Sequence, residues 1–180
     1  YGLSDPQAEE QITDRLSFRR FLGLGLEGAV PDETTLVRFR QRLIECGLHE
    51  DLLELLNEQL AAKGYLLKTT TLVDATLVEA SRRKPSRAAE QDGTAPDAAA
   101  SYTKKRGQTH YGYKAHLSAD GEHGLIRRAQ VTTAKRHDGA LLREVTPPEA
   151  GTVYADRAYD HAANRRWLAE RGLGDGILKQ

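Results

Sequence analysis

The spacing of hydrophobic residues changes near residue 69. Before that point apolar residues recur every three or four positions, for example Leu36, Phe39 and Leu43, which is the period of an amphipathic helix. From Thr69 onward β-branched residues become common and the period shortens toward two, which is typical of strands. The pattern therefore predicts an all-helical domain over residues 1–66 and a mixed α/β domain over residues 67–180.

Three helices are predicted in the N-terminal part. Ser4-Asp5-Pro6-Gln7 begins the first one with a capping signature, and we expect this helix to continue to Phe21. Asp32 is the expected cap of a second helix, and the third runs over residues 49–63. Such a bundle suits either a packing or dimerisation element or a module that recognises DNA ends. In the second case the phosphate contacts come from Arg38, Arg40 and Arg42.

The C-terminal part predicts strands and helices in a definite order. Strands are expected at residues 69–79, 109–118, 125–132 and 152–155 and from residue 177, with helices at 138–145 and 162–171. Three antiparallel strands followed by alternating helices and parallel strands form a ribonuclease-H-like fold. Residues 82–103 have no period and few large apolar side chains, so we expect a flexible insertion there.

Two aspartates stand out because they occupy strand-like surroundings. Asp74 lies inside the apolar run 72–76, and Asp156 follows the apolar run 153–155. Either residue taken singly has an equally good interpretation as a strand-end or capping residue. In the expected fold, however, the first strand lies beside the fourth, so the two carboxylates should be neighbours. Two hard oxygen ligands are the minimum for a Mg²⁺ site that acts on phosphoryl groups.

The composition of the chain bears on its partners and on the cell compartment in which it works. The 26 basic and 26 acidic residues cancel, so the net charge favours no partner. The single Cys46 excludes an internal disulfide and fits a reducing, cytoplasmic compartment. No apolar run approaches membrane-spanning length, and no secretory leader opens the chain. Because the chain begins at Tyr1 and contains no Met, we expect it to be a piece of a longer reading frame.

Basic residues are concentrated in the middle of the chain. They flank the expected insertion and comprise Arg82, Arg83, Lys84, Arg87, Lys104, Lys105 and Arg106. Such a run is compatible with a solvated face or with binding of nucleic acid. His110, Lys114 and His116 alternate on one face of an expected strand and are candidates to line a DNA groove. Arg157 is a candidate phosphate contact or a strand-end charge, and the pair His137-Asp138 either orients the site or caps a helix.

Several segments together resemble transposases of the insertion-sequence-five type, within the DDE transposases. The matching segments are Ser17–Leu24, Pro31–Arg40, Leu72–Thr76, Thr109–His116, His137-Asp138 and Tyr154–Asp160. The resemblance implies a bacterial DNA transposase that cleaves strands and transfers them. It implies Asp74 and Asp156 as the first two acids of the catalytic triad and two Mg²⁺ ions with Mn²⁺ as an alternative. A zinc site is not expected, because one Cys and scattered His residues fit no zinc-ligand spacing. The implied partners are transposon ends, target DNA and a second copy in a homodimer, in the cytoplasm near the nucleoid.

One feature departs from that family. The third acid is a Glu on a helix after the fifth strand, and no residue here matches it, because Glu170 lies one element too early. We therefore expect a chain that is truncated before the third acid and inactive by itself. The alternative interpretation is a catalytically inactive remnant that binds DNA or dimerises with a full-length transposase.

Overall fold

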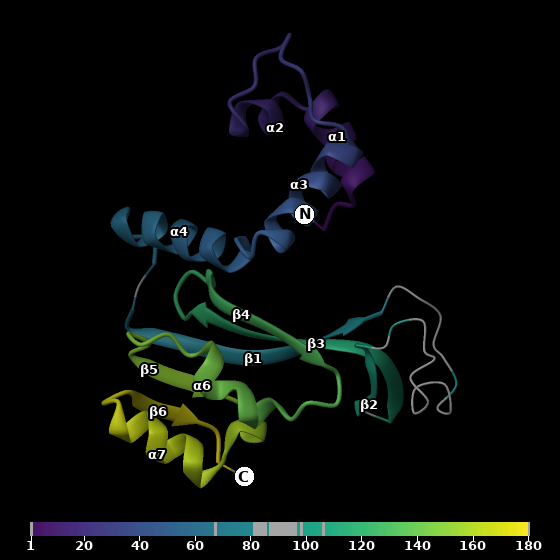
Figure 1. Ribbon diagram of the computed structural model, residues 1–180. Helices are drawn as coiled ribbons and strands as arrows, with labels where there is room; N and C mark the ends of the chain where they lie inside the picture. Colours follow the sequence, from purple (N-terminus) through teal and green to yellow (C-terminus); the bar gives the residue numbers. More distant parts are fainter. Residues whose placement is uncertain are drawn as a thin grey trace. The chain divides into compact units, whose positions relative to one another are not determined.

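The computed structural model describes residues 2–66, 68–80, 86, 97, 99–105 and 107–179 (Figure 1). Contacts divide the chain into two compact units, Tyr1–Leu53 and Glu54–Gln180. The division lies earlier than the expected boundary after residue 66, because the second half of helix α4 (His49–Ala62) contacts the sheet. There, Nδ2 of Asn57 donates a 2.8 Å hydrogen bond to O of Arg127.

The first unit contains three helices ahead of α4: α1 (Asp5–Asp14), α2 (Leu16–Phe21) and α3 (Glu33–Glu45). The expectation of one helix up to Phe21 was wrong, because Arg15 adopts an extended conformation (φ −107°, ψ 117°) that separates α1 from α2. The predicted caps are confirmed. The N–H of Ser4 donates to Oε1 of Gln7 at 2.9 Å, and Oδ1 of Asp32 accepts from the N–H of Thr35 at 2.6 Å. The bond from Thr35 lowers the pKa of Asp32.

The second unit is built on a six-stranded mixed sheet. Its strands are β1 (Thr70–Glu79), β2 (Ser101–Lys105), β3 (Gln108–Asp120), β4 (Ile126–Thr133), β5 (Thr152–Ala155) and β6 (Gly174–Ile177). Strand β1 is central: it pairs antiparallel with β3 and parallel with β5, and β6 continues the sheet beyond β5. Strands β2 and β4 both pair with β3. The predicted ribonuclease-H-like mixed sheet behind an N-terminal helical part is confirmed.

Strand β2 was not expected from the sequence, and strand β6 begins earlier than expected. Strand β2 contains residues 101–103, so the expected insertion extended too far, and Ser101 is buried where it pairs with Gly112. Strand β6 begins at Gly174, three residues before the expected start at residue 177. Glycine fits there because a Cβ at Gly174 would meet the side chain of Thr152, and a Cβ at Gly176 would meet the ring of Tyr154. The rest of the expected insertion, residues 82–85, 87–96 and 98, lies outside the described residues.

Short helices pack on one face of the sheet. These elements are η1 (Asp138–Leu141), α6 (Leu142–Val145), η2 (Arg157–Tyr159) and α7 (Ala162–Glu170), and Figure 1 shows α6 and α7 on the same side of the strands. The core between them and the sheet consists of Val73, Leu142, Val145, Ala150, Val153, Ala155, Tyr159, Leu168 and Ile177. Among the described helices, none is long and apolar enough to cross a bilayer.

Candidate active site

Asp74 and Asp156 lie on neighbouring parallel strands. In the ladder between β1 and β5, Leu72 is opposite Tyr154 and Val73 is opposite Ala155. Asp74 and Asp156 are the next residues on each strand. Directly opposed residues of parallel strands project to the same face, and both aspartates are exposed, as are Leu72 and Tyr154. The topology therefore brings the two predicted acids to one face and one end of the β1–β5 pair.

One oxygen of each carboxylate is held by the backbone. Oδ1 of Asp74 accepts a 2.7 Å hydrogen bond from the N–H of Ala75. Oδ1 of Asp156 accepts a 2.9 Å bond from the N–H of Ala158, so Asp156 also caps η2. Within the described part of the chain, Oδ2 of both residues has no hydrogen-bond partner. We expected Asp74 in a buried strand, but its side chain is exposed in the structure, so its charge carries no burial cost.

A buried tyrosine of the core is influenced by the charges of both carboxylates. Tyr159 is fully buried, and its hydroxyl has no hydrogen-bond partner among the described residues. Burial raises the pKa of Tyr159, and the negative charges of Asp138, Asp74 and Asp156 raise it further. The phenol is therefore neutral and keeps its proton as a hydrogen-bond donor. Sequence reasoning had included Tyr159 only as part of a motif, because an aromatic residue three positions after an aspartate has no distinctive pattern.

Asp138 is held by an ion pair rather than by a cap. Its Oδ1 accepts a 2.7 Å bond from Nζ of Lys114, which also donates to O of Arg136 at 2.8 Å. The residue that caps η1 is His137, whose Nδ1 accepts from the N–H of Gly139 at 3.2 Å. Of the pair His137-Asp138, which was expected either to cap a helix or to orient the site, His137 caps the helix and Asp138 lies in its first turn. The side chain of Lys114 is only 13% exposed. Its charge is therefore paired inside the protein with Asp138.

His116 does not line an exposed groove. Its side chain is fully buried, and its Nε2 lies 2.9 Å from Oγ1 of Thr132. The reason is that β3 presents His116 to the face of the sheet that carries α6, whereas the expectation considered only the alternation of residues along the strand. Burial lowers the pKa of His116, which favours the neutral ring.

The other candidate DNA contacts fall into three groups. In α3, Arg38 is exposed, but Arg40 forms a bidentate pair with Asp5, whose pKa is lowered by the bond from Arg40. Lys104 and Lys105 are exposed at the end of β2, and Arg157 is exposed directly after Asp156. Arg42 of α3 is also exposed. The residues of the basic run that lie outside the described residues are Arg82, Arg83, Lys84, Arg87 and Arg106.

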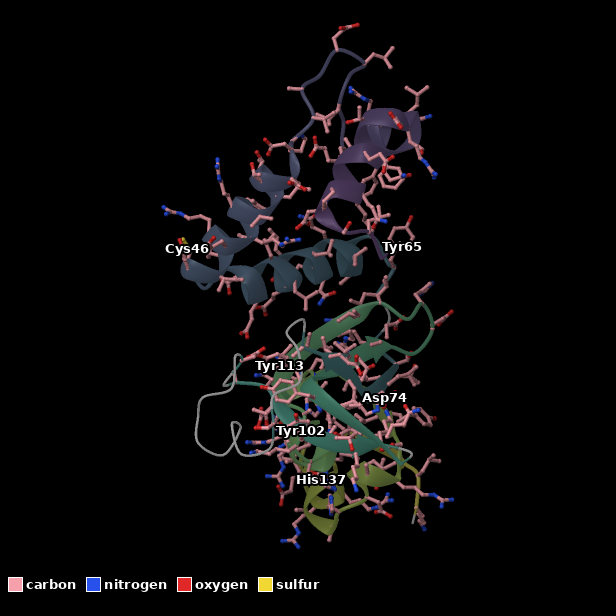
Figure 2. All side chains as sticks on the ribbon, turned by 90° about the vertical axis from the view of Figure 1, so that its right-hand side faces the viewer. Cys46, Tyr65, Asp74, Tyr102, Tyr113 and His137 are labelled. Carbon is pink, nitrogen blue, oxygen red and sulfur yellow. The ribbon has the colours of Figure 1, made fainter. Side chains whose placement is uncertain are left out.

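The donor atoms of the two aspartates fit a hard divalent cation. Each offers a carboxylate oxygen that is not used by a protein donor in the described part, and Mg²⁺ and Mn²⁺ prefer such oxygens. Among the described residues no group of three or more His, Cys, Asp or Glu side chains converges to hold a metal ion. At these two positions the described chain offers two carboxylates, fewer than a group of that size. Figure 2 labels Asp74 on the sheet of the second unit.

Comparison with protein families agrees with this arrangement. The family model described as Transposase DDE domain matches residues 66–174, which include both aspartates and the whole sheet up to the start of β6. A second model, Transposase domain (DUF772), matches residues 1–42 in the helical unit. No solved structure matches the chain. The order of the two matches, and the extent of the first over most of the chain, show that this protein belongs to the DDE transposases.

Proposed function

We propose that this chain carries the Asp74–Asp156 part of a metal-dependent centre that cleaves DNA strands and transfers them during transposition of an insertion sequence. The observation that supports the proposal most strongly is the placement of the two aspartates at successive positions after the paired residues Val73 and Ala155. Two carboxylates on adjacent strands form a pair of oxygen ligands that distant parts of the chain create only by folding.

The protein's own groups prepare this centre. The backbone bonds from Ala75 and Ala158 fix one oxygen of each carboxylate and leave the other oxygen available. Divalent cations, when bound, activate a water or a 3′-hydroxyl and stabilise the leaving oxygen of a phosphodiester. Lys114 neutralises Asp138 nearby, so the local negative charge is concentrated on Asp74 and Asp156. The buried Tyr159 is neutral and adds no charge of its own.

DNA is the proposed partner, and basic residues of both units are its proposed contacts. Lys104 and Lys105 are exposed on β2, Arg38 on α3 and Arg157 beside Asp156. Lys114 remains a candidate only if DNA competes with its bond to Asp138. Arg40 must likewise leave Asp5 to reach a phosphate. A homodimer acting on nucleoid DNA in a bacterial cytoplasm completes the proposal, and a non-catalytic DNA-binding remnant is the second candidate because the described residues supply only two acids.

A nicking assay tests the catalytic part. Supercoiled plasmid is incubated with the full-length protein and Mg²⁺ or Mn²⁺, and the nicked form is measured on gels. Asp74→Asn and Asp156→Asn should each abolish nicking, because the amide keeps the size of the side chain but removes the charge that holds the cation. Asp14→Asn, at the exposed end of α1, is the matched control and should nick like the wild type.

Binding to a labelled duplex, measured without metal, distinguishes the two candidate functions. Binding without nicking by the wild type would reject the catalytic proposal and favour the non-catalytic one. Neutralising Lys104 and Lys105 together should lower the salt dependence of duplex binding by about two phosphate contacts, or roughly 0.9 units of slope for each. An unchanged slope would remove β2 from the proposed DNA surface and leave the aspartate claim standing.

A further inference from the structure

A hollow lies on the η1, α6 and α7 side of the second unit. It has a volume of about 480 Å³ and is lined by His137, Gly139, Ala140, Arg143, His161, Ala163 and Asn164. Figure 2 shows His137, which forms one wall, toward the part of the unit that contains α7. None of the lining residues is acidic, and four of them carry side-chain nitrogen groups that can donate hydrogen bonds.

The donors in the hollow are arranged by contacts within the protein. Nδ1 of His137 accepts from the N–H of Gly139, so the neutral ring carries its proton on Nε2. Arg143 uses Nη2 to donate to O of Ala163 at 3.0 Å, and a guanidinium has further N–H groups beyond that one. The rings of His137 and His161 have centroids 5.4 Å apart and are tilted by 60°, which leaves both within reach of one small group.

A buried amide keeps the walls of the hollow together. Asn164 is 5% exposed, and its Nδ2 donates to O of Gly139 at 2.8 Å and to O of Tyr159 at 3.1 Å. Gly139 permits this close packing, because a Cβ there would lie 2.6 Å from O of Ala158 and 2.7 Å from Nε2 of His161. The positions of the two histidines are therefore set before any ligand arrives, and preorganised donors lose less entropy on binding.

We propose that this hollow is a subsite for a phosphate group, formed by Arg143, His137 and His161. A cavity that presents a guanidinium and ring N–H donors without a carboxylate matches a ligand that is anionic and accepts hydrogen bonds at several oxygens. The uncapped N-terminus of α7, a nine-residue helix that begins at Ala162, adds a favourable dipole.

The position of the hollow indicates which phosphate it takes. His161 follows Asp156 after the short helix η2, so the two are separated by at most about 18 Å of extended chain. A DNA strand advances about 3.4 Å per nucleotide. The subsite would therefore hold a backbone phosphate within a few nucleotides of the cleaved one, and would position the strand without reading its sequence. The assignment of this phosphate to the DNA backbone rests on the proposed function.

The first test follows the histidine rings directly and needs no DNA. Inorganic phosphate is titrated into the metal-free chain while the imidazole signals are followed by NMR, with His137→Gln and His161→Gln used to assign them. Both rings should shift with one dissociation constant. Arg143→Gln should weaken that binding by about ten-fold or more, because it removes a charged hydrogen-bond donor. Arg166→Gln, an exposed arginine of the same helix α7 that does not line the hollow, should leave it unchanged.

Trp167 fluorescence verifies that each variant is folded, and His161→Gln provides a second substitution if Arg143→Gln proves unstable. The subsite is refuted if phosphate shifts neither ring, or if Arg143→Gln and His161→Gln bind phosphate as tightly as Arg166→Gln.

The second test identifies the source of the phosphate. Duplex binding is measured over a range of salt concentrations without metal, and Arg143→Gln should reduce the slope by about one unit relative to Arg166→Gln. An unchanged slope in a chain that binds DNA would overturn the DNA assignment, while the proposed function would stand. If the wild type bound no duplex, the proposed function and the DNA source would both fail, and the NMR titration would still decide whether the hollow binds phosphate.

Discussion

Asp74 and Asp156 each follow one residue of the parallel pair Val73–Ala155, so the ladder between β1 and β5 places them side by side at its end. Each carboxylate gives one oxygen to a neighbouring backbone N–H. The second oxygens are the available ones, and a cation is the partner that both can bind at once. This relationship leads to a prediction that does not depend on catalysis.

We predict that Mn²⁺ binds to the chain through both aspartates. Asp74→Asn and Asp156→Asn should each weaken Mn²⁺ binding by about ten-fold or more, since a charged ligand is replaced by a neutral amide. The free ion can be counted by its electron paramagnetic resonance signal. Asp14→Asn should bind like the wild type. Equal affinities in all four proteins would place the cation elsewhere.

Gly151 should tolerate no side chain. Its φ of +64° lies in the left-handed region, and a Cβ there would lie 2.0 Å from O of Thr69, next to the start of β1. Gly172 has a similar φ of +67° but open space around it, so Gly172→Ala should cost only the conformational strain, about 1–2 kcal/mol. Gly151→Ala should cost at least about 2 kcal/mol more, because backbone must move. Urea unfolding of the two variants measures the difference, and equal losses would show that the turn relaxes freely.

Leu168 should be a principal anchor of α7. It is fully buried in the core beneath the helix, so Leu168→Ala should lower the free energy of unfolding by about 2–5 kcal/mol. Trp167, the single tryptophan, packs against the same core and reports unfolding by its fluorescence. Leu178→Ala makes the same chemical change at a side chain whose residue is 60% exposed, and should change stability by less than about 0.5 kcal/mol. Similar effects of the two substitutions would contradict this packing.

His116 should make the second unit less stable in mild acid. Burial lowers the pKa of His116 below the ordinary value of 6.5, although the charge of Asp138 opposes this and that of Lys114 reinforces it. Just below pH 6.5, His116 therefore binds a proton in the unfolded chain but stays neutral in the folded protein. The free energy of unfolding should fall as the pH drops from 6.5 toward the depressed pKa, and the contribution should be fully present above 6.5.

The comparison that checks this is urea unfolding between pH 7.5 and 5 for the wild type and His116→Gln. The variant should be less stable at pH 7.5, where it loses the packed ring, and its stability should fall less steeply between 6.5 and 5. Parallel curves for the two proteins would mean that His116 does not contribute to the acid sensitivity.

Local patterns were enough to predict most of the elements. The caps at Ser4 and Asp32, the strand over residues 70–79 and the strand over residues 152–155 follow from side-chain types and periods that act over a few residues. The order of strands and helices then predicted the topology of the sheet. In that topology the strand with Asp74 lies next to the strand that precedes Asp156. These features could be predicted because caps, alternation and strand order depend on neighbours in the chain.

Tertiary packing decided the rest. Residues Gly174–Ile177 have poor strand propensity, yet they form β6 because Thr152 and Tyr154 fill the space above the glycines. His116 and Lys114 have the same polar alternation as an exposed strand, but the sheet presents them to a covered face, where one is buried and the other is bound to Asp138. The hollow between His137 and His161 joins three elements, so no local pattern could reveal it. In each case the deciding contact joins residues far apart in the sequence, and only folding brings them together.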